Sequence, residues 1–229
     1  LLKFFKLLLC ISSVCSIFGI ITWFVCVCSV WSLFSFISTL FPFCNVFRLG
    51  ITFGLLNDSL LIIYGDIIFE KKILEKFLKS EDEISLITDQ NWKEYWKIRF
   101  ENPLDDAESL ELDQDGFIQN IGQKVKNIDE ISGQYIGLIK FPKKSIQKIL
   151  EFYDVMKEKS KTGKNPLNSN VPFEQSYMTD FLQAMINSGF KIKSIPVKNG
   201  WLELDSINDY NLYKKLFDNG QIKNFFNSN

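Results

Sequence analysis

The run Leu60-Leu-Ile-Ile-Tyr64, followed directly by Gly65-Asp66, is the clearest structural signal in this sequence. Five consecutive apolar residues before a turn are typical of a strand that is buried on both faces, as in a parallel or mixed sheet. Ile73 to Lys79 then shows helical apolar spacing, and Ile84 to Thr88 is a second apolar run. This β-α-β alternation predicts an α/β fold.

The same patterns continue towards the C-terminus. Residues 108–112 and 117–121 flank the dipeptide Asp115-Gly116, which predicts a hairpin. The further expected strands are Gln134 to Phe141, Phe190 to Val197 and Trp201 to Leu204, and the further expected helices are Pro142 to Lys159, Pro172 to Ser188 and Ser206 to Phe217. We therefore expect a three-layer α/β sandwich with a mostly parallel, mixed, Rossmann-like sheet at 57–217, and a frayed tail at 218–229.

Residues 1–56 form an apolar segment that differs from the rest of the chain. No residue from Leu7 to Phe47 is charged, and about 20 apolar residues suffice to cross a bilayer. Lys3 and Lys6 would place the N-terminus of such an anchor in the cytoplasm. A leader that is not authentic, for instance a frameshifted translation, is the alternative, and a buried part of the core is a third. Without an anchor, the expected location is cytoplasmic.

Composition excludes several classes of function. There is no histidine, and the five cysteines all lie within 1–56, which excludes histidine-based nucleophile schemes and cysteine chemistry in the body. After residue 56 there are 23 basic and 27 acidic residues, a net charge of −4 without a basic stripe. Nucleic acid is therefore not an expected partner. The chemistry must use carboxylates, Lys, Arg, Tyr or a hard metal ion.

Two acidic groups are candidates for that chemistry. Asp66 follows a strand and a glycine, and ligands of open α/β sheets gather beyond the carboxyl ends of strands. Glu203 and Asp205 share one face of the strand that begins at Trp201. Two aspartates at strand ends can share Mg²⁺, which takes oxygen ligands. A plain turn at Asp66 and a helix cap at Asp205 or Ser206 are the simpler interpretations.

An aromatic group precedes the hairpin. Trp92 with Trp96, and Tyr95 with Arg99, are pairs four residues apart on a helical turn. Aromatic faces can enclose a quaternary ammonium, and an arginine can bind a phosphate. An aromatic stripe packed against the sheet is the simpler interpretation.

Four short motifs, taken in order, resemble the nucleotidyltransferases that make NDP-sugars and CDP-choline, closest to the phosphocholine cytidylyltransferase branch. They are Leu61-Ile-Ile-Tyr-Gly-Asp-Ile-Ile-Phe69, Gly133-Gln-Tyr-Ile-Gly-Leu138, Tyr177-Met-Thr-Asp-Phe-Leu182 and Gly200-Trp-Leu-Glu-Leu-Asp-Ser-Ile-Asn-Asp209. The resemblance implies transfer of a nucleotidyl group from an NTP, with CTP expected, to a phosphomonoester such as phosphocholine. Pyrophosphate leaves and a CDP-linked product forms. A sugar-1-phosphate nucleotidyltransferase that makes an NDP-sugar is the alternative.

By position, the resemblance implies that Asp66 and Asp205 are the catalytic residues and the ligands of a Mg²⁺ cofactor. It also implies that Glu203 lies beside these ligands, that Gly133, Gly137 and Asp180 shape the acceptor pocket, and that Trp92, Tyr95, Trp96 and Trp201 face a trimethylammonium group. Gly65, which lets a substrate approach Asp66, and Arg99, which could bind its phosphate, complete the expected substrate-binding residues. The glycine-rich loop with which the family begins has no counterpart in 1–56. The domain is therefore expected to be N-terminally incomplete, and an inactive, membrane-tethered relative stays open as a second class of function.

Overall fold

The computed structural model describes residues 25–27, 59–80 and 83–227. Apart from 25–27, the apolar segment 1–56 lies outside the described residues, and so does Asn57. The predictions of an anchor, of a foreign leader and of the domain boundary at 57 therefore stay predictions.

A five-stranded sheet lies at the centre of the molecule, in the order β1-β2-β7-β4-β8. Strand β2 is parallel to β1 and antiparallel to β7, while β4 is antiparallel to β7 and parallel to β8. Within this sheet only β7 runs against its neighbours, which confirms a mostly parallel, mixed sheet. The strands are β1 (Val25–Val27), β2 (Leu60–Tyr64), β4 (Ser85–Asp89), β7 (Gln134–Phe141) and β8 (Lys193–Val197).

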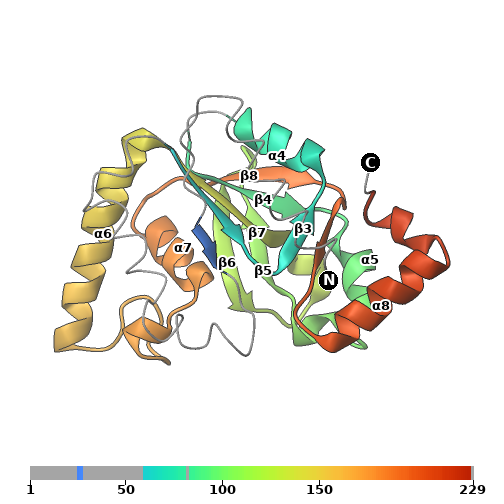
Figure 1. The fold of residues 1–229 in the computed structure, drawn as a ribbon. Coiled ribbons are helices and arrows are strands. Elements are labelled where there is room, and N and C mark those ends of the chain that lie inside the picture. The colour runs from blue at the N-terminus through green and yellow to red at the C-terminus, as the bar shows by residue number, and fades with distance from the viewer. Residues whose placement is uncertain (1–24, 28–58, 81–82, 228–229) are drawn as a thin grey trace.

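Burial on both faces explains why the central strands are mainly apolar without a regular alternation of polar and apolar residues. All five residues of β4 are buried, and so are seven of the eight residues of β7. A strand covered on both faces cannot alternate polar with apolar side chains. Figure 1 shows these strands between α6 and α7 on one side and α5 and α8 on the other, which confirms the predicted layers. The helices are α4 (Lys71–Leu78), α5 (Trp92–Arg99), α6 (Lys143–Thr162), α7 (Met178–Asn187) and α8 (Ile207–Asp218).

Two helices differ from their predicted bounds. Helix α6 continues to Thr162, past the predicted end at Lys159. The predicted helix Pro172 to Ser188 is instead a 3₁₀ turn at Phe173–Gln175 followed by α7. The break lies at Tyr177, which is extended, and its N–H donates to Asp180 Oδ2 at 2.8 Å. The carboxylate of Asp180, the third residue of α7, thus satisfies the backbone N–H of the capping residue Tyr177, and a new helix starts at Met178.

Two ribbons of paired strands flank the sheet. The predicted hairpin is present as β5 (Glu108–Leu112) and β6 (Ile118–Lys124). The other ribbon joins β3 (Ile67–Phe69) to β9 (Trp201–Glu203), with Ile67 opposite Glu203. Strand β3 was not predicted, because Gly65-Asp66 indicated the end of a strand rather than a turn between two.

The prediction of a frayed tail is wrong for residues 218–227. A short 3₁₀ turn occupies Gln221–Asn224. The Gly200 N–H donates to the Phe225 carbonyl oxygen at 2.6 Å, and the Phe225 ring lies 5.9 Å from the Tyr95 ring. The end of the chain therefore packs on the same aromatic layer as α5.

Candidate active site

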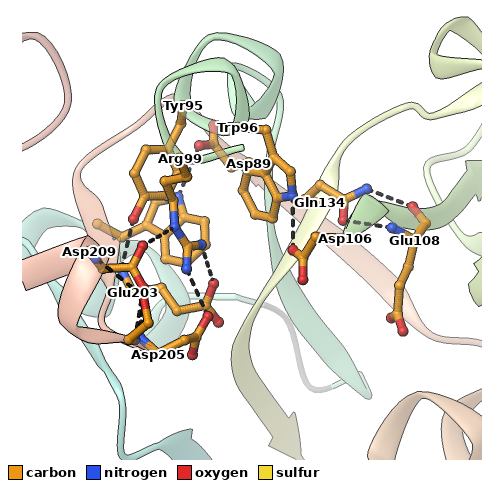
Figure 2. A network of polar contacts seen from close by, with 12 residues as sticks. Asp89, Tyr95, Trp96, Arg99, Asp106, Glu108, Gln134, Glu203, Asp205 and Asp209 are labelled. Atoms are coloured by element: carbon orange, nitrogen blue, oxygen red, sulfur yellow. Dashed lines mark hydrogen bonds and ion pairs between the residues drawn. The ribbon is translucent and has the colours of Figure 1, made fainter. Parts of the chain in front are cut away.

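Arg99, the last residue of α5, lies at the centre of an ion-pair cluster. Its Nη1 donates to Glu203 Oε2 at 2.6 Å, its Nη2 to Asp205 Oδ2 at 2.7 Å, and its Nε to Asp209 Oδ1 at 2.9 Å. Figure 2 shows the three carboxylates gathered around the guanidinium group. The Arg99 side chain is 1% exposed. All three of its nitrogen atoms are therefore engaged by acids of β9, of α8 and of the short segment between them.

Aromatic rings support the Arg99 guanidinium from within α5 and just beyond it. The guanidinium carbon lies 5.5 Å from the Tyr95 ring centre, 5.7 Å from that of Trp96 and 5.0 Å from that of Phe100. The Tyr95 hydroxyl oxygen also accepts from the Glu203 N–H at 2.8 Å, so the same helix fixes the backbone of β9. Cation–π contacts of this kind are strongest for a desolvated cation.

Asp209 has mainly a structural role in this cluster. Its Oδ2 accepts from the N–H groups of Asp205 and Ser206 and from the Ser206 hydroxyl, and the Ser206 hydroxyl accepts from the Asp209 N–H. This is the predicted capping box at the start of α8. Burial opposes ionisation of Asp209, but the hydrogen bonds from Arg99 and Ser206 outweigh it and lower its pKa. Asp209 therefore stays a carboxylate that anchors Arg99.

Glu203 and Asp205 form the more open side of the cluster. The Glu203 side chain is 22% exposed and that of Asp205 is 47% exposed. Burial, reinforced by the charges of Asp205 and Asp66, raises the pKa of Glu203 to about 7, although Arg99 opposes the shift. Like charges this close disfavour one another's ionised forms. This edge of the molecule therefore carries more negative charge than Arg99 neutralises.

Asp66 lies close enough to these acids for its charge to raise the pKa of Glu203, and its role as a metal ligand stays a prediction. Gly65 and Asp66 form the turn from β2 to β3, and the Asp66 carbonyl oxygen accepts from the Leu204 N–H at 2.8 Å. The pairing of β3 with β9 thus brings Asp66 next to the segment that carries Glu203 and Asp205. The turn and the capping box, the two simpler interpretations, are also present, and they are compatible with this arrangement.

The Mg²⁺ site expected at Asp66 and Asp205 stays a prediction. In the described ranges 59–80 and 83–227, no group of three or more His, Cys, Asp or Glu side chains could hold a metal ion. Mg²⁺ usually keeps several waters and is bound by one or two carboxylates together with substrate phosphates. Asp66 and Asp205 supply that number of carboxylates at a site with excess negative charge.

The aromatic side chains that were predicted to form a cage around a ligand are buried inside the protein. Trp92, Tyr95, Trp96 and Trp201 are all buried, and the Trp201 ring lies 5.3 Å from the Tyr95 ring and 6.0 Å from the Trp96 ring. Trp96 Nε1 donates to Asp106 Oδ2 at 3.0 Å. The stripe packs in the core, as the simpler interpretation had it, because its rings fill the space between α5 and β9.

Asp89, the last residue of β4, holds Trp201 and two backbone N–H groups in place. We did not predict this role from the sequence. Asp89 is fully buried, and its Oδ1 accepts from the N–H groups of Asn91 (2.8 Å) and Asn199 (3.0 Å). Its Oδ2 accepts from Trp201 Nε1 at 2.9 Å. Burial raises the pKa of Asp89 despite these donors. Its position after an apolar strand, the signal used for Asp66, could have identified it.

We expect Asp89→Asn to lower the free energy of unfolding by about 1–3 kcal/mol, because an amide NH₂ would face an N–H donor in a dry site. Urea denaturation would measure the change. Asp113→Asn is a matched control: Asp113 accepts from two backbone N–H groups and one side-chain amide, but it lies at an exposed turn. Equal losses in the two variants would show that burial of Asp89 is unimportant.

The remaining predicted positions are occupied by contacts within the chain. A Cβ on Gly137 would lie 2.8 Å from the Tyr64 ring, and one on Gly133 would lie 3.1 Å from the Asp89 carbonyl oxygen. The space beside each of these glycines is therefore filled by other atoms of the protein. The prediction was that the space lets the backbone approach an acceptor. Asp180 caps α7 and accepts from Asn168 Nδ2 at 3.0 Å. It contributes a negative charge that raises the pKa of Glu108, after burial and Asp106.

Membrane association was one expectation for this chain. None of the helices in its described part combines the length and apolar character that a bilayer-spanning segment needs. The apolar segment that prompted the expectation lies outside that part, except for residues 25–27.

Comparison with known proteins supports the resemblance seen in the motifs. No family model matches the chain. A protein of Campylobacter jejuni named CTP:phosphoglutamine cytidylyltransferase is 35% identical over 153 residues, which cover 67% of this chain and 58% of that protein. The chain thus spans little more than half the length of this relative. The sequence relationship confirms the predicted similarity to nucleotidyltransferases.

Among solved structures, the chain is similar to an inositol-1-phosphate CTP transferase from T. maritima. The TM-score is 0.47 and the sequence identity is 18%, over 75% of this chain and 62% of that chain.

Proposed function

Because this chain is related to the nucleotidyltransferases, we propose that it transfers a cytidylyl group from CTP to a phosphorylated small molecule at the Arg99 cluster. The observation that carries the proposal is the proximity of Asp66 to Glu203 and Asp205, in a chain 35% identical over 153 residues to a protein named as a cytidylyltransferase. The protein would act in the cytoplasm, where its nucleotide donor is available. It would need no nucleic acid.

In the proposed reaction, an oxygen of the acceptor phosphate attacks the α-phosphorus of CTP. The bond between that phosphorus and the oxygen bridging to the β-phosphate breaks, and pyrophosphate leaves. The phosphate is already ionised at neutral pH, so no histidine or cysteine nucleophile is required. Asp66 and Asp205 would hold Mg²⁺, which supplies neutralisation of the charge on the phosphates when bound. Glu203 would keep the site polar beside them.

The proposed acceptor is a small polar phosphorylated compound such as phosphoglutamine. The relative of this chain is named for that compound, and the Trp92, Trp96 and Trp201 rings are buried, so they offer no open face to a trimethylammonium group. Phosphocholine and sugar 1-phosphates are the competing acceptors, and a comparison of the three at equal concentration would rank them.

The test is pyrophosphate release by the full chain with CTP, Mg²⁺ and phosphoglutamine. We expect turnover that Asp205→Asn lowers at least about 100-fold, because loss of one charged group at a phosphoryl-transfer centre has effects of that size. Asp66→Asn should behave alike. Asp218→Asn, which alters an exposed carboxylate paired with Lys214 on α8, should leave the rate unchanged. No turnover with any of the three acceptors would favour the non-catalytic relative instead.

A further inference from the structure

We infer that Arg99 is a positioning residue, which holds the Asp205 carboxylate, with Glu203 beside it, in the orientation that binds the metal ion, and that it does not itself contact a substrate phosphate. The inference rests on the proposed function and extends it to a residue outside the metal ligands. It also replaces the phosphate contact that the spacing of Tyr95 and Arg99 first indicated.

The first step of the inference concerns the two terminal nitrogen atoms of Arg99, which donate to two different carboxylates. Glu203 is the last residue of β9, and Asp205 lies two positions further along the chain. Arg99 Nη1 holds one and Nη2 the other, each through a single carboxylate oxygen. A planar guanidinium fixes the separation of its two contacts, which an ammonium group on a flexible stem cannot do.

The second step is that Arg99 is itself immobilised. Asp209 holds Nε from the first turn of α8, and the capping box fixes Asp209 in turn. The rings of Tyr95, Trp96 and Phe100 pack around the guanidinium group. A rigid donor of this kind determines where the Asp205 carboxylate lies, although that side chain is 47% exposed.

The third step concerns access. With 1% of its side chain exposed, Arg99 could reach a phosphate only by giving up an ion pair of 2.9 Å or shorter. That exchange would leave Glu203 or Asp209 charged in a poorly solvated position. If Arg99 only orients the carboxylates that it already contacts, no ion pair has to be given up.

Mn²⁺ binding, followed by electron paramagnetic resonance as a stand-in for Mg²⁺, tests this role without relying on turnover. We expect Arg99→Lys to weaken Mn²⁺ binding about 10–100-fold, the usual effect of removing a partner that orients a metal ligand. Lys93→Gln is the matched control, because Lys93 lies on the same helix and pairs with exposed Asp129 at 2.9 Å. Unchanged Mn²⁺ affinity in Arg99→Lys, with a raised KM for the phosphomonoester, would overturn the inference.

A measurement on the unaltered chain covers the case in which Arg99→Lys fails to fold. The ¹⁵N–¹H resonance of the Arg99 Nε should move when Mg²⁺ and CTP are added together. It should not move when the phosphomonoester is added alone, and a shift under that condition would identify a phosphate-contacting arginine. If the unaltered chain binds no Mn²⁺ at all, the metal site of the proposed function is wrong. If the unaltered chain and Arg99→Lys bind Mn²⁺ equally well, only the positioning role of Arg99 is wrong.

Discussion

Arg99→Met should lower the free energy of unfolding by about 3–5 kcal/mol, the range found when one partner of a buried ion pair is removed. Methionine keeps an apolar stem but lacks the guanidinium group, so the change removes the charge together with its hydrogen bonds and its contacts with the Tyr95 and Trp96 rings. It leaves Glu203, Asp205 and Asp209 facing one another, and the Asp209 side chain is only 8% exposed. Urea denaturation followed by tryptophan fluorescence would report the loss, because Trp96 and Trp201 lie in this layer.

The control for Arg99→Met is Lys93→Met. Lys93 also lies on α5 and makes an ion pair, but only with Asp129. The Lys93 side chain is 36% exposed and that of Asp129 is 79% exposed. Exposed pairs contribute about 0–1 kcal/mol, so this variant should stay within that range. Similar losses in the two variants would mean that the cluster around Arg99 contributes no more than an ordinary surface ion pair.

Gly122→Ala should destabilise the protein by about 2–5 kcal/mol. Gly122 has a φ of +76°, and an added Cβ would lie 2.3 Å from Cβ of Thr179 at the start of α7. The left-handed backbone conformation costs about 1–2 kcal/mol for a residue with a Cβ, and forced overpacking about 1–3 kcal/mol more. Thermal and urea unfolding would measure the sum.

Gly116→Ala separates these two contributions. Gly116 has the same φ of +76°, but a Cβ there would meet only Lys193 side-chain atoms, at 3.9 Å. It should therefore lose only the conformational part, about 1–2 kcal/mol. If both variants are destabilised equally, β6 and α7 do not approach as closely as the structure shows, and the position of Asp180 would need revision.

Local patterns in the sequence were enough to predict the elements that depend on local contacts. Strand β7 has its predicted bounds, Gln134–Phe141, because a run of buried residues between a glycine and Pro142 leaves little alternative. The cap of α8 was also predicted, since Ser206 and Asp209 satisfy one another within one turn. Strand β3 was missed because three residues give no periodicity, and its partner is β9, far along the chain.

The candidate site shows the same division. The placement of Asp66 and Asp205 at strand ends followed from the alternation of elements, whereas the partners of Arg99 did not. The helical spacing put Arg99 on a face with Tyr95, but what that face contacts depends on acids 104 to 110 residues away. For the same reason the spacing of the tryptophans indicated one shared face of a helix, without showing that this face is covered by β9.

The order in which the chain can fold follows from the ribbon of β3 and β9. Closure of so long a loop is entropically unfavourable before other contacts form, and pairings of high sequence separation are slow. During synthesis, Asp66 and Arg99 emerge well before the acids of β9 and α8 with which they assemble. A growing chain therefore has no assembled carboxylate cluster until α8 has docked, and binding of the proposed metal ion and nucleotide would begin only then.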